Sequence, residues 1–117
     1  MPQMHQWDLS FGPVSGAAGT TTTITVAPQC LFRVEKVMAT DTGSPPGTGT
    51  RVMQFLVGQR LQRPASSGST LVSFFGPGAL GNGVRWDACE RAISISITIS
   101  FVQPCTFDMT CFGSAVI

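Results

Sequence analysis

Charged side chains are scarce in this sequence. They make up 11% of the 117 residues, against about 25% in a typical soluble domain. Six arginines and the single lysine, Lys36, nearly balance the acidic residues, so the net charge is only +1. A chain with this balance has neither a basic field that attracts nucleic acid nor an acidic tail. We therefore expect no specific nucleic-acid binding.

The shortage of charge also bears on whether this protein works alone or as a subunit of an assembly. A domain that is free in water carries charges on its surface for solubility. Interface cores are depleted in lysine and glutamate and relatively rich in arginine, methionine and aromatic residues. The composition therefore favours a subunit that is covered by neighbouring protein. A GC-rich genome, which favours arginine over lysine, is the alternative explanation.

Long apolar runs and helical periodicity are also missing. No apolar stretch is long enough to cross a membrane as a helix, so we expect no transmembrane segment. The first eleven residues have neither a basic start nor an apolar run, which predicts no signal peptide. No window of eleven or more residues has apolar positions at the spacing of a helix face.

Signatures of catalysis and of metal or cofactor binding are equally sparse. His5 is the only histidine, and no G-x-S-x-G surrounds any serine, so we expect no enzyme. The cysteines contain no C-x-x-C pair, which disfavours zinc, and we expect free, mostly buried thiols at Cys30, Cys89, Cys105 and Cys111. The run GPGALG (76–81) fits a dinucleotide spacing, but Asn-Gly follows it instead of a helix, so we interpret it as a turn. We predict no cofactor. A pair of catalytic carboxylates of the glycosidase type, assembled from distant strands, stays open.

Alternation with a period of two dominates what is present. The sequence predicts one domain over residues 1–117, an all-β, jelly-roll-like antiparallel β-sandwich of about eight strands. An immunoglobulin-like sandwich is the alternative, but the order of cysteine and tryptophan does not fit it. The expected strands are 5–11, 20–26, 30–40, 50–58, 70–75, 84–90, 91–101 and 106–117, with connections at 12–19, 41–49, 59–69 and 76–83. The expected core is Ile24, Val26, Phe32, Val34, Phe55, Val57, Ile93, Ile95, Ile97, Ile99, Phe107 and Met109.

The stretch RAISISITISF (91–101) sets isoleucine against serine or threonine with almost no break. Its second face is polar yet uncharged, whereas exposed strands usually carry lysine, which keeps other strands away. Hydroxyl groups tolerate both water and a neighbouring subunit, without the cost of burying a charge. We hypothesise that this face, or the edge of this strand, is covered in the working state. The run Thr20–Thr23 allows an ice-binding or sugar-binding ladder, but we interpret it as β propensity and packing.

Several segments together resemble a known class of proteins. TITVAPQCLFRVEKVMATDT (23–42), QFLVGQRLQ (54–62), ISISITISF (93–101) and FDMTCFGSAVI (107–117) look like small virus-type or phage-type single jelly-roll capsid and decoration proteins. The resemblance implies a structural subunit that assembles with copies of itself or with other shell proteins, in a virion or an intracellular assembly. It implies no catalytic residues, and it leaves open whether the role is major, minor or decorative.

Six residues are predicted to contact neighbouring subunits, because tryptophan, phenylalanine and arginine anchor interfaces. They are Trp7, Arg33, Arg60, Phe75, Trp86 and Phe112. A small lectin-like carbohydrate-binding module, with Trp86 and Asp87 in a loop pocket, is one alternative function. A filament or sheet subunit of non-viral origin is another, and a compact enzyme would need His5 beside a carboxylate in a cleft.

Overall fold

The computed structural model describes residues 4–28, 30–44, 48–63, 70–71, 87–90 and 93–116. Within these residues the protein consists of β-strands, turns and irregular segments, with no helix. The expected strand segments 72–75, 84–86 and 91–92 and the expected loop 76–83 lie outside the described residues. The all-β expectation is confirmed.

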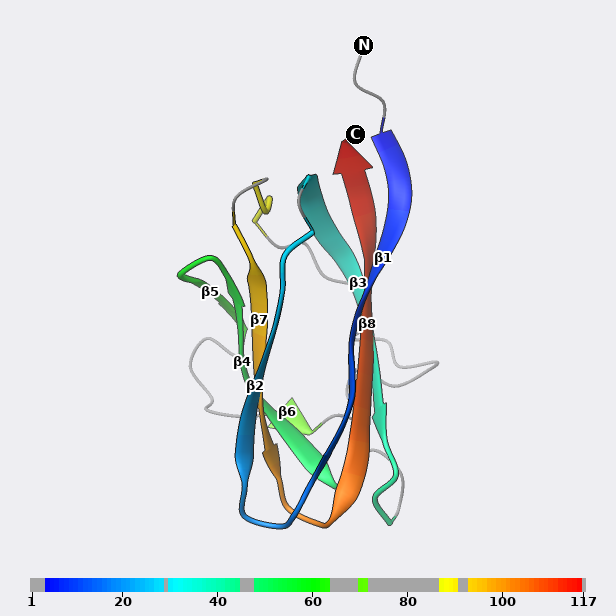
Figure 1. Cartoon of the computed structure of the whole chain (residues 1–117), viewed down its shortest axis with the longest axis vertical. Helices are drawn as coiled ribbons and strands as arrows, with labels where there is room; N and C mark the ends of the chain where they lie inside the picture. The colour runs from blue at the N-terminus through cyan, green and yellow to red at the C-terminus, as the bar shows by residue number, and fades with distance from the viewer. Residues whose placement is uncertain are drawn as a thin grey trace.

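Six long strands form two antiparallel sheets of three strands each (Figure 1). The first, here named the β8 sheet after its central strand, has the order β1 (Met4–Gly16), β8 (Cys105–Val116), β3 (Leu31–Asp41). The second, the β7 sheet, has the order β2 (Thr21–Val26), β7 (Ile95–Phe101), β4 (Thr50–Val57). Two short segments pair with β4: β5 (Arg60–Arg63) and β6 (Thr70–Leu71). In the described part of the chain, six main strands and the two short ones beside β4 build the two sheets, where about eight strands are expected from the sequence.

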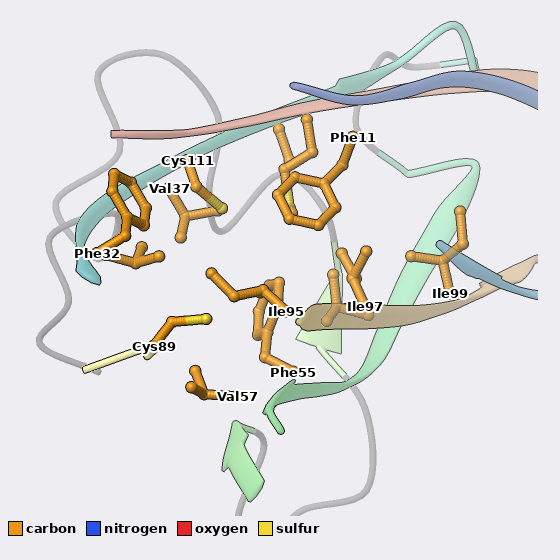
Figure 2. Packing of buried hydrophobic residues seen from close by; sticks show 14 of the residues in the cluster. Phe11, Phe32, Val37, Phe55, Val57, Cys89, Ile95, Ile97, Ile99 and Cys111 are labelled. Atoms are coloured by element: carbon orange, nitrogen blue, oxygen red, sulfur yellow. The ribbon is translucent and has the colours of Figure 1, made fainter. Parts of the chain in front are cut away.

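The core lies between the two sheets because alternate residues of every long strand are apolar. On β7, Ile95, Ile97, Ile99 and Phe101 are fully buried, and Figure 2 shows the isoleucines with Phe55 facing Phe11 and Cys111 of the β8 sheet. Nine of the expected core residues are buried: Phe32, Val34, Phe55, Val57, Ile95, Ile97, Ile99, Phe107 and Met109. Burial of this apolar surface is the main force that holds the sheets together.

Three expected core positions differ. Ile93 is 36% exposed, because it precedes β7, which begins only at Ile95, and its N–H donates to the carbonyl of Glu90. Ile24 and Val26 are half-buried and pack against the core. They belong to β2, which is the outermost strand of its sheet, so only one neighbouring strand covers them.

Bulges account for the errors in predicted strand phase. Strict alternation with Phe55 places Met53 on the inner side, but Met53 is 39% exposed and Val52 is buried instead. The pairing of β4 with β7 skips one residue between Val52 and Gln54, and the extra residue reverses the alternation. A bulge between Val34 and Lys36 has the same effect in β3, where Val37 is buried in place of Met38.

Two expected connections are partly strands. Residues 12–16, expected as a loop, continue β1 to Gly16 after a bulge between Phe11 and Val14. Residues 60–63, expected as part of a polar connection, form β5. In both places the residues are small or polar, so the sequence shows no apolar alternation, yet the backbone pairs with a neighbouring strand.

Asp41 links the two sheets, although we expected it in a surface loop. It ends β3 and is only 3% exposed. Its carboxylate accepts hydrogen bonds from the N–H of Gly43 at 2.9 Å and from the N–H and hydroxyl of Thr50 at 2.9 and 2.7 Å. Thr50 begins β4. The bond to Gly43 is an Asx turn, which reverses the chain as it leaves the β8 sheet.

Candidate functional site

The outer side of the β7 sheet is the surface that the sequence singled out. β7 lies between β2 and β4, so both of its backbone edges are paired within the chain. The edges of β7 are therefore covered by strands of the same chain, and the expected cover by neighbouring protein can concern only its polar face. Its serine and threonine side chains, at Ser94, Ser96, Thr98 and Ser100, remain half-buried on the outer side.

Threonines of β2 extend this polar surface. Thr21, Thr23 and Thr25 are exposed and lie opposite Ser100, Thr98 and Ser96 of β7. The hydroxyl groups of Thr23 and Thr98 are 3.0 Å apart, and those of Thr25 and Ser96 are 3.1 Å apart, so each pair shares a hydrogen bond. We name these six residues the hydroxyl face: Thr21, Thr23, Thr25, Ser96, Thr98 and Ser100.

Sequence reasoning found only half of the hydroxyl face. The threonine run was interpreted as β propensity, but its alternate members join the polar side of β7 in one array. The spacing T-x-T-x-T at 21–25 carries the signal, because alternate residues of a strand share a side. What the sequence does not state is that β2 pairs with β7.

The hydroxyl face borders on β4, which adds mainly uncharged groups. Gln54 and Leu56 are half-buried beside β7, and Met53 is exposed. Arg51 is the only charged residue in β2, β4 and β7. A second protein that approaches this side meets few charges that would have to be stripped of water.

The outer side of the β8 sheet has a different composition. Asp8, Glu35, Lys36 and Asp108 are exposed there, and Arg33 is half-buried. The Ser114 hydroxyl donates a hydrogen bond to the Glu35 carboxylate at 2.6 Å. This side presents charges of both signs, as solvated protein surfaces do.

The four predicted contact residues that the structure describes do not form one patch. Arg33 and Phe112 lie near one another on the outer side of the β8 sheet, where their strands pair. Trp7 alternates with Leu9 and Phe11 and so lies on the other side of that sheet, 39% exposed. Arg60 follows the turn after β4 and pairs with Asp87 at 3.6 Å. Phe75 and Trp86 lie outside the described residues.

Arg33 borders a hollow of about 340 Å³. Leu31, Glu35, Ala88 and Ser114 are among the other residues that line it. Among the described residues, the Nε of Arg33 is enclosed and finds no hydrogen-bond partner. A buried donor without a partner is costly, but an enclosed nitrogen is out of reach of a second molecule, so it is no evidence for a contact between subunits. Arg33 stays a predicted contact residue.

Burial favours the protonated form of three of the four thiols. Cys30, Cys89 and Cys111 are buried and Cys105 is half-buried, which confirms the expected burial. Burial raises the pKa of the Cys111 thiol far above its ordinary value, and it also raises the pKa of Cys89 and of Cys105. Protonated thiols are poor nucleophiles and poor metal ligands. Within the described residues, no three histidine, cysteine or acidic side chains come together as a metal site.

The enzyme and lectin-like alternatives that the sequence left open gain little support from the described residues. The side chain of His5 lies outside the described residues, so its place beside a carboxylate stays a prediction. Asp87, which the lectin-like alternative places in a binding pocket, forms an ion pair with Arg60.

The part of the chain that the structure describes holds no apolar helix of membrane-spanning length. No protein-family model, curated protein or solved structure matches this chain.

Proposed function

We propose that this chain is a structural subunit of a viral or phage-type shell, which acts by assembling with copies of itself or with other shell proteins. The observation that carries the proposal is the hydroxyl face. It is a polar array across β2 and β7 that contains no charge. Serine and threonine hydroxyls exchange bonds to water for bonds to a neighbour at little cost.

A jelly-roll fold is part of the proposal, and the strand order supports it. A jelly roll can be drawn as an antiparallel ribbon that pairs strand 1 with 8, 2 with 7, 3 with 6 and 4 with 5 before it wraps into two sheets. The pairs β1–β8, β2–β7 and β4–β5 follow this scheme, and β3–β8 and β4–β7 are the pairs that wrapping adds. This fold occurs in capsid proteins and lectins alike, so the surface must decide between functions.

The outer edge of β3 is where a sixth strand of a jelly roll belongs. Cys89 lies there and forms a bridge with Phe32, with backbone hydrogen bonds of 2.9 and 2.6 Å. Cys89 belongs to the segment 84–90, which the sequence predicts as the strand before β7. The bridge therefore supports the pairing of β3 with the sixth strand of the jelly-roll scheme. In this scheme the sixth strand corresponds to the segment that contains Cys89 and not to the short β6.

Surface area also supports assembly. The accessible surface of the chain is 6400 Å², and a standard contact buries about 800 Å² of each partner. Two such contacts would cover about a quarter of the molecule. A subunit with several neighbours therefore benefits from a sheet face that carries almost no charge.

Light scattering after size exclusion, combined with negative-stain microscopy, tests the proposal. The wild-type protein is expected to form regular particles, tubes or sheets at high concentration. Thr98→Lys places a charge in the middle of the hydroxyl face and is expected to prevent them. Thr110→Lys is the matched control, because Thr110 is also a half-buried threonine of a central strand, but in the β8 sheet.

The outcomes separate the candidate functions. Closed particles favour the shell, whereas tubes or sheets favour the filament alternative. A wild-type protein that stays monomeric at every concentration contradicts self-assembly. Binding of such a monomer on a glycan array would favour the lectin-like alternative instead.

A further inference from the structure

The two sheets have four outer strand edges, and three of them carry features that prevent another strand from adding. β1 contains a bulge between Phe11 and Val14, and Pro13 within it has no N–H to donate. β3 contains a bulge next to Lys36, and Cys89 already occupies its outer edge near Phe32. Bulges, prolines, lysines and covering segments are the usual protections of a strand edge.

The edge of the β7 sheet beyond β4 is short. β5 has four residues and starts with Arg60, whose side chain is exposed, and β6 has only two residues. Short and charged edge strands offer little to a partner.

β2 is the exception among the four edges. Its six residues, Thr21–Val26, contain no charge, no proline and no bulge. Among the described strands β7 is its only ladder partner. An edge strand of this kind is a template for another strand.

The pattern of hydrogen bonds shows which backbone groups of β2 are available. The N–H of Phe101 donates to the carbonyl of Thr20 at 2.8 Å, which sets the phase of the ladder: the carbonyl of Thr20 points toward β7. Pairs alternate in an antiparallel ladder, which makes Thr21, Thr23 and Thr25 the residues whose N–H and C=O point away from β7. Side chains approach most closely in such pairs, as the hydroxyl contacts of Thr23 and Thr25 with β7 show.

We propose that the open edge of β2 pairs with β2 of a second copy of this chain, antiparallel, about a two-fold axis at Thr23. The inference rests on the proposed self-assembly and adds the contact through which it starts. Thr23 would face Thr23 of the second copy, and Thr21 would face Thr25, which gives about six backbone hydrogen bonds, two for each facing pair. All three threonines lie on the same side of the sheet, so the hydroxyl face continues across the axis.

A second copy fits this edge better than an unrelated partner does. A two-fold contact brings each residue near its own equivalent, which for a charged strand means repulsion, and β2 has no charge. Leu9 and Val14 of β1 and Ile24 and Val26 of β2 are only half-buried along the same side of the molecule. The ladder spans about 20 Å, and these apolar side chains add area along a molecule that is 48 Å long.

The test compares two substitutions at Thr23 by sedimentation velocity over a range of concentrations. Thr23→Pro removes an N–H that β7 does not use, and proline is tolerated at such edge positions. It is expected to weaken dimer formation about 10-fold or more. Thr23→Val is the control: it also removes the hydroxyl but keeps the N–H, so it is expected to associate more strongly than Thr23→Pro.

Hydrogen exchange provides a second readout that needs no variant. The amides of Thr21, Thr23 and Thr25 are expected to exchange rapidly in dilute monomer and at least about 10-fold more slowly in the dimer.

If Thr23→Pro fails to fold, Thr21→Pro replaces it in the sedimentation experiment, since proline is also accepted at the first residue of a strand.

Each remaining outcome has a defined meaning. Association of folded Thr23→Pro at wild-type strength would overturn the edge contact and leave self-assembly through other surfaces standing. Protection of the three amides already in the monomer would place a segment of the same chain on this edge and would also overturn it. Open fibrils built from β2 would contradict the closed two-fold pair. A wild-type chain that never associates would instead remove the proposed function itself.

Discussion

The β8 sheet and the β7 sheet contribute similar apolar residues to one core, but they differ on their outer sides. The β8 sheet carries exposed charges of both signs, among them Asp8, Lys36 and Asp108. The β7 sheet carries hydroxyl groups across β2 and β7, and Arg51 is the only charge in its three long strands. Since both sheets bury one side equally well, folding does not require this difference. The proposed function accounts for this difference, because it places neighbouring subunits against the β7 sheet.

The outer strands of the two sheets also differ in regularity. β1 and β3 each contain a bulge in their pairing with β8, and β4 contains one in its pairing with β7, whereas β2 pairs with β7 without interruption. Bulges bend and twist a strand and make it a poorer template for another strand. The β8 sheet is therefore protected at both of its edges, whereas the β7 sheet keeps one regular and uncharged edge strand, β2.

Gly113→Ala, a substitution in the β8 sheet, is expected to cause the largest loss of stability. Gly113 lies in β8 opposite Val34, beside the bulge of β3. A β-carbon on Gly113 would overlap the carbonyl oxygen of Arg33 and lie 3.1 Å from the Cα of Val34. Both are backbone atoms, so β3 would have to move away from β8. We expect the free energy of unfolding in urea to fall by about 3 kcal/mol.

Ser114→Ala is the control on the next residue of β8. It loses the hydrogen bond to Glu35 on the outer side and should cost about 1 kcal/mol or less. An equal loss in both variants would show that β8 is sensitive along its whole length, and the special role of Gly113 would be refuted.

Asp41→Asn tests the link between the sheets and is expected to rank second. The carboxylate accepts three hydrogen bonds with its two oxygens, two of them from Thr50 of the other sheet. An amide has only one acceptor oxygen, so at least one buried donor loses its partner. We expect a loss of about 2 kcal/mol in urea unfolding. Thr50→Ser, which retains both donors, should cost less, and a neutral Asp41→Asn would show that the link is dispensable.

Period-two patterning predicted much of the fold from sequence. Ile95, Ile97 and Ile99 are buried as expected, and Phe107, Met109 and Cys111 share one inner side of β8. Both stretches are central strands, whose alternation continues without a break on the residues concerned. A period of two suffices where pairing is regular.

The predictions from sequence failed where the burial of a residue depends on how its strand pairs with a distant strand. The bulge opposite β7 turned Met53 outward, and no local pattern around Met53 announces it. The burial of Asp41 depends on Thr50, which arrives from the other sheet. The hydroxyl face likewise required the knowledge that β2 pairs with β7. Contacts between distant segments, not local propensities, set these features.

The smallest effect is expected from the hydroxyl pair itself, and it bears most directly on why the sheets differ. Thr23→Val and Thr98→Val remove the two hydroxyls of one hydrogen bond while keeping shape and β-branching. Replacing both partners of a hydrogen bond by apolar groups is close to neutral, so a double-mutant cycle in urea should give a coupling of about 1 kcal/mol or less. Such a result would mean that the fold does not need these hydroxyls and that the surroundings of the β7 sheet account for them. A coupling well above that value would make the hydroxyl face a requirement of folding, and its case as an interface would then rest on the absence of charge alone.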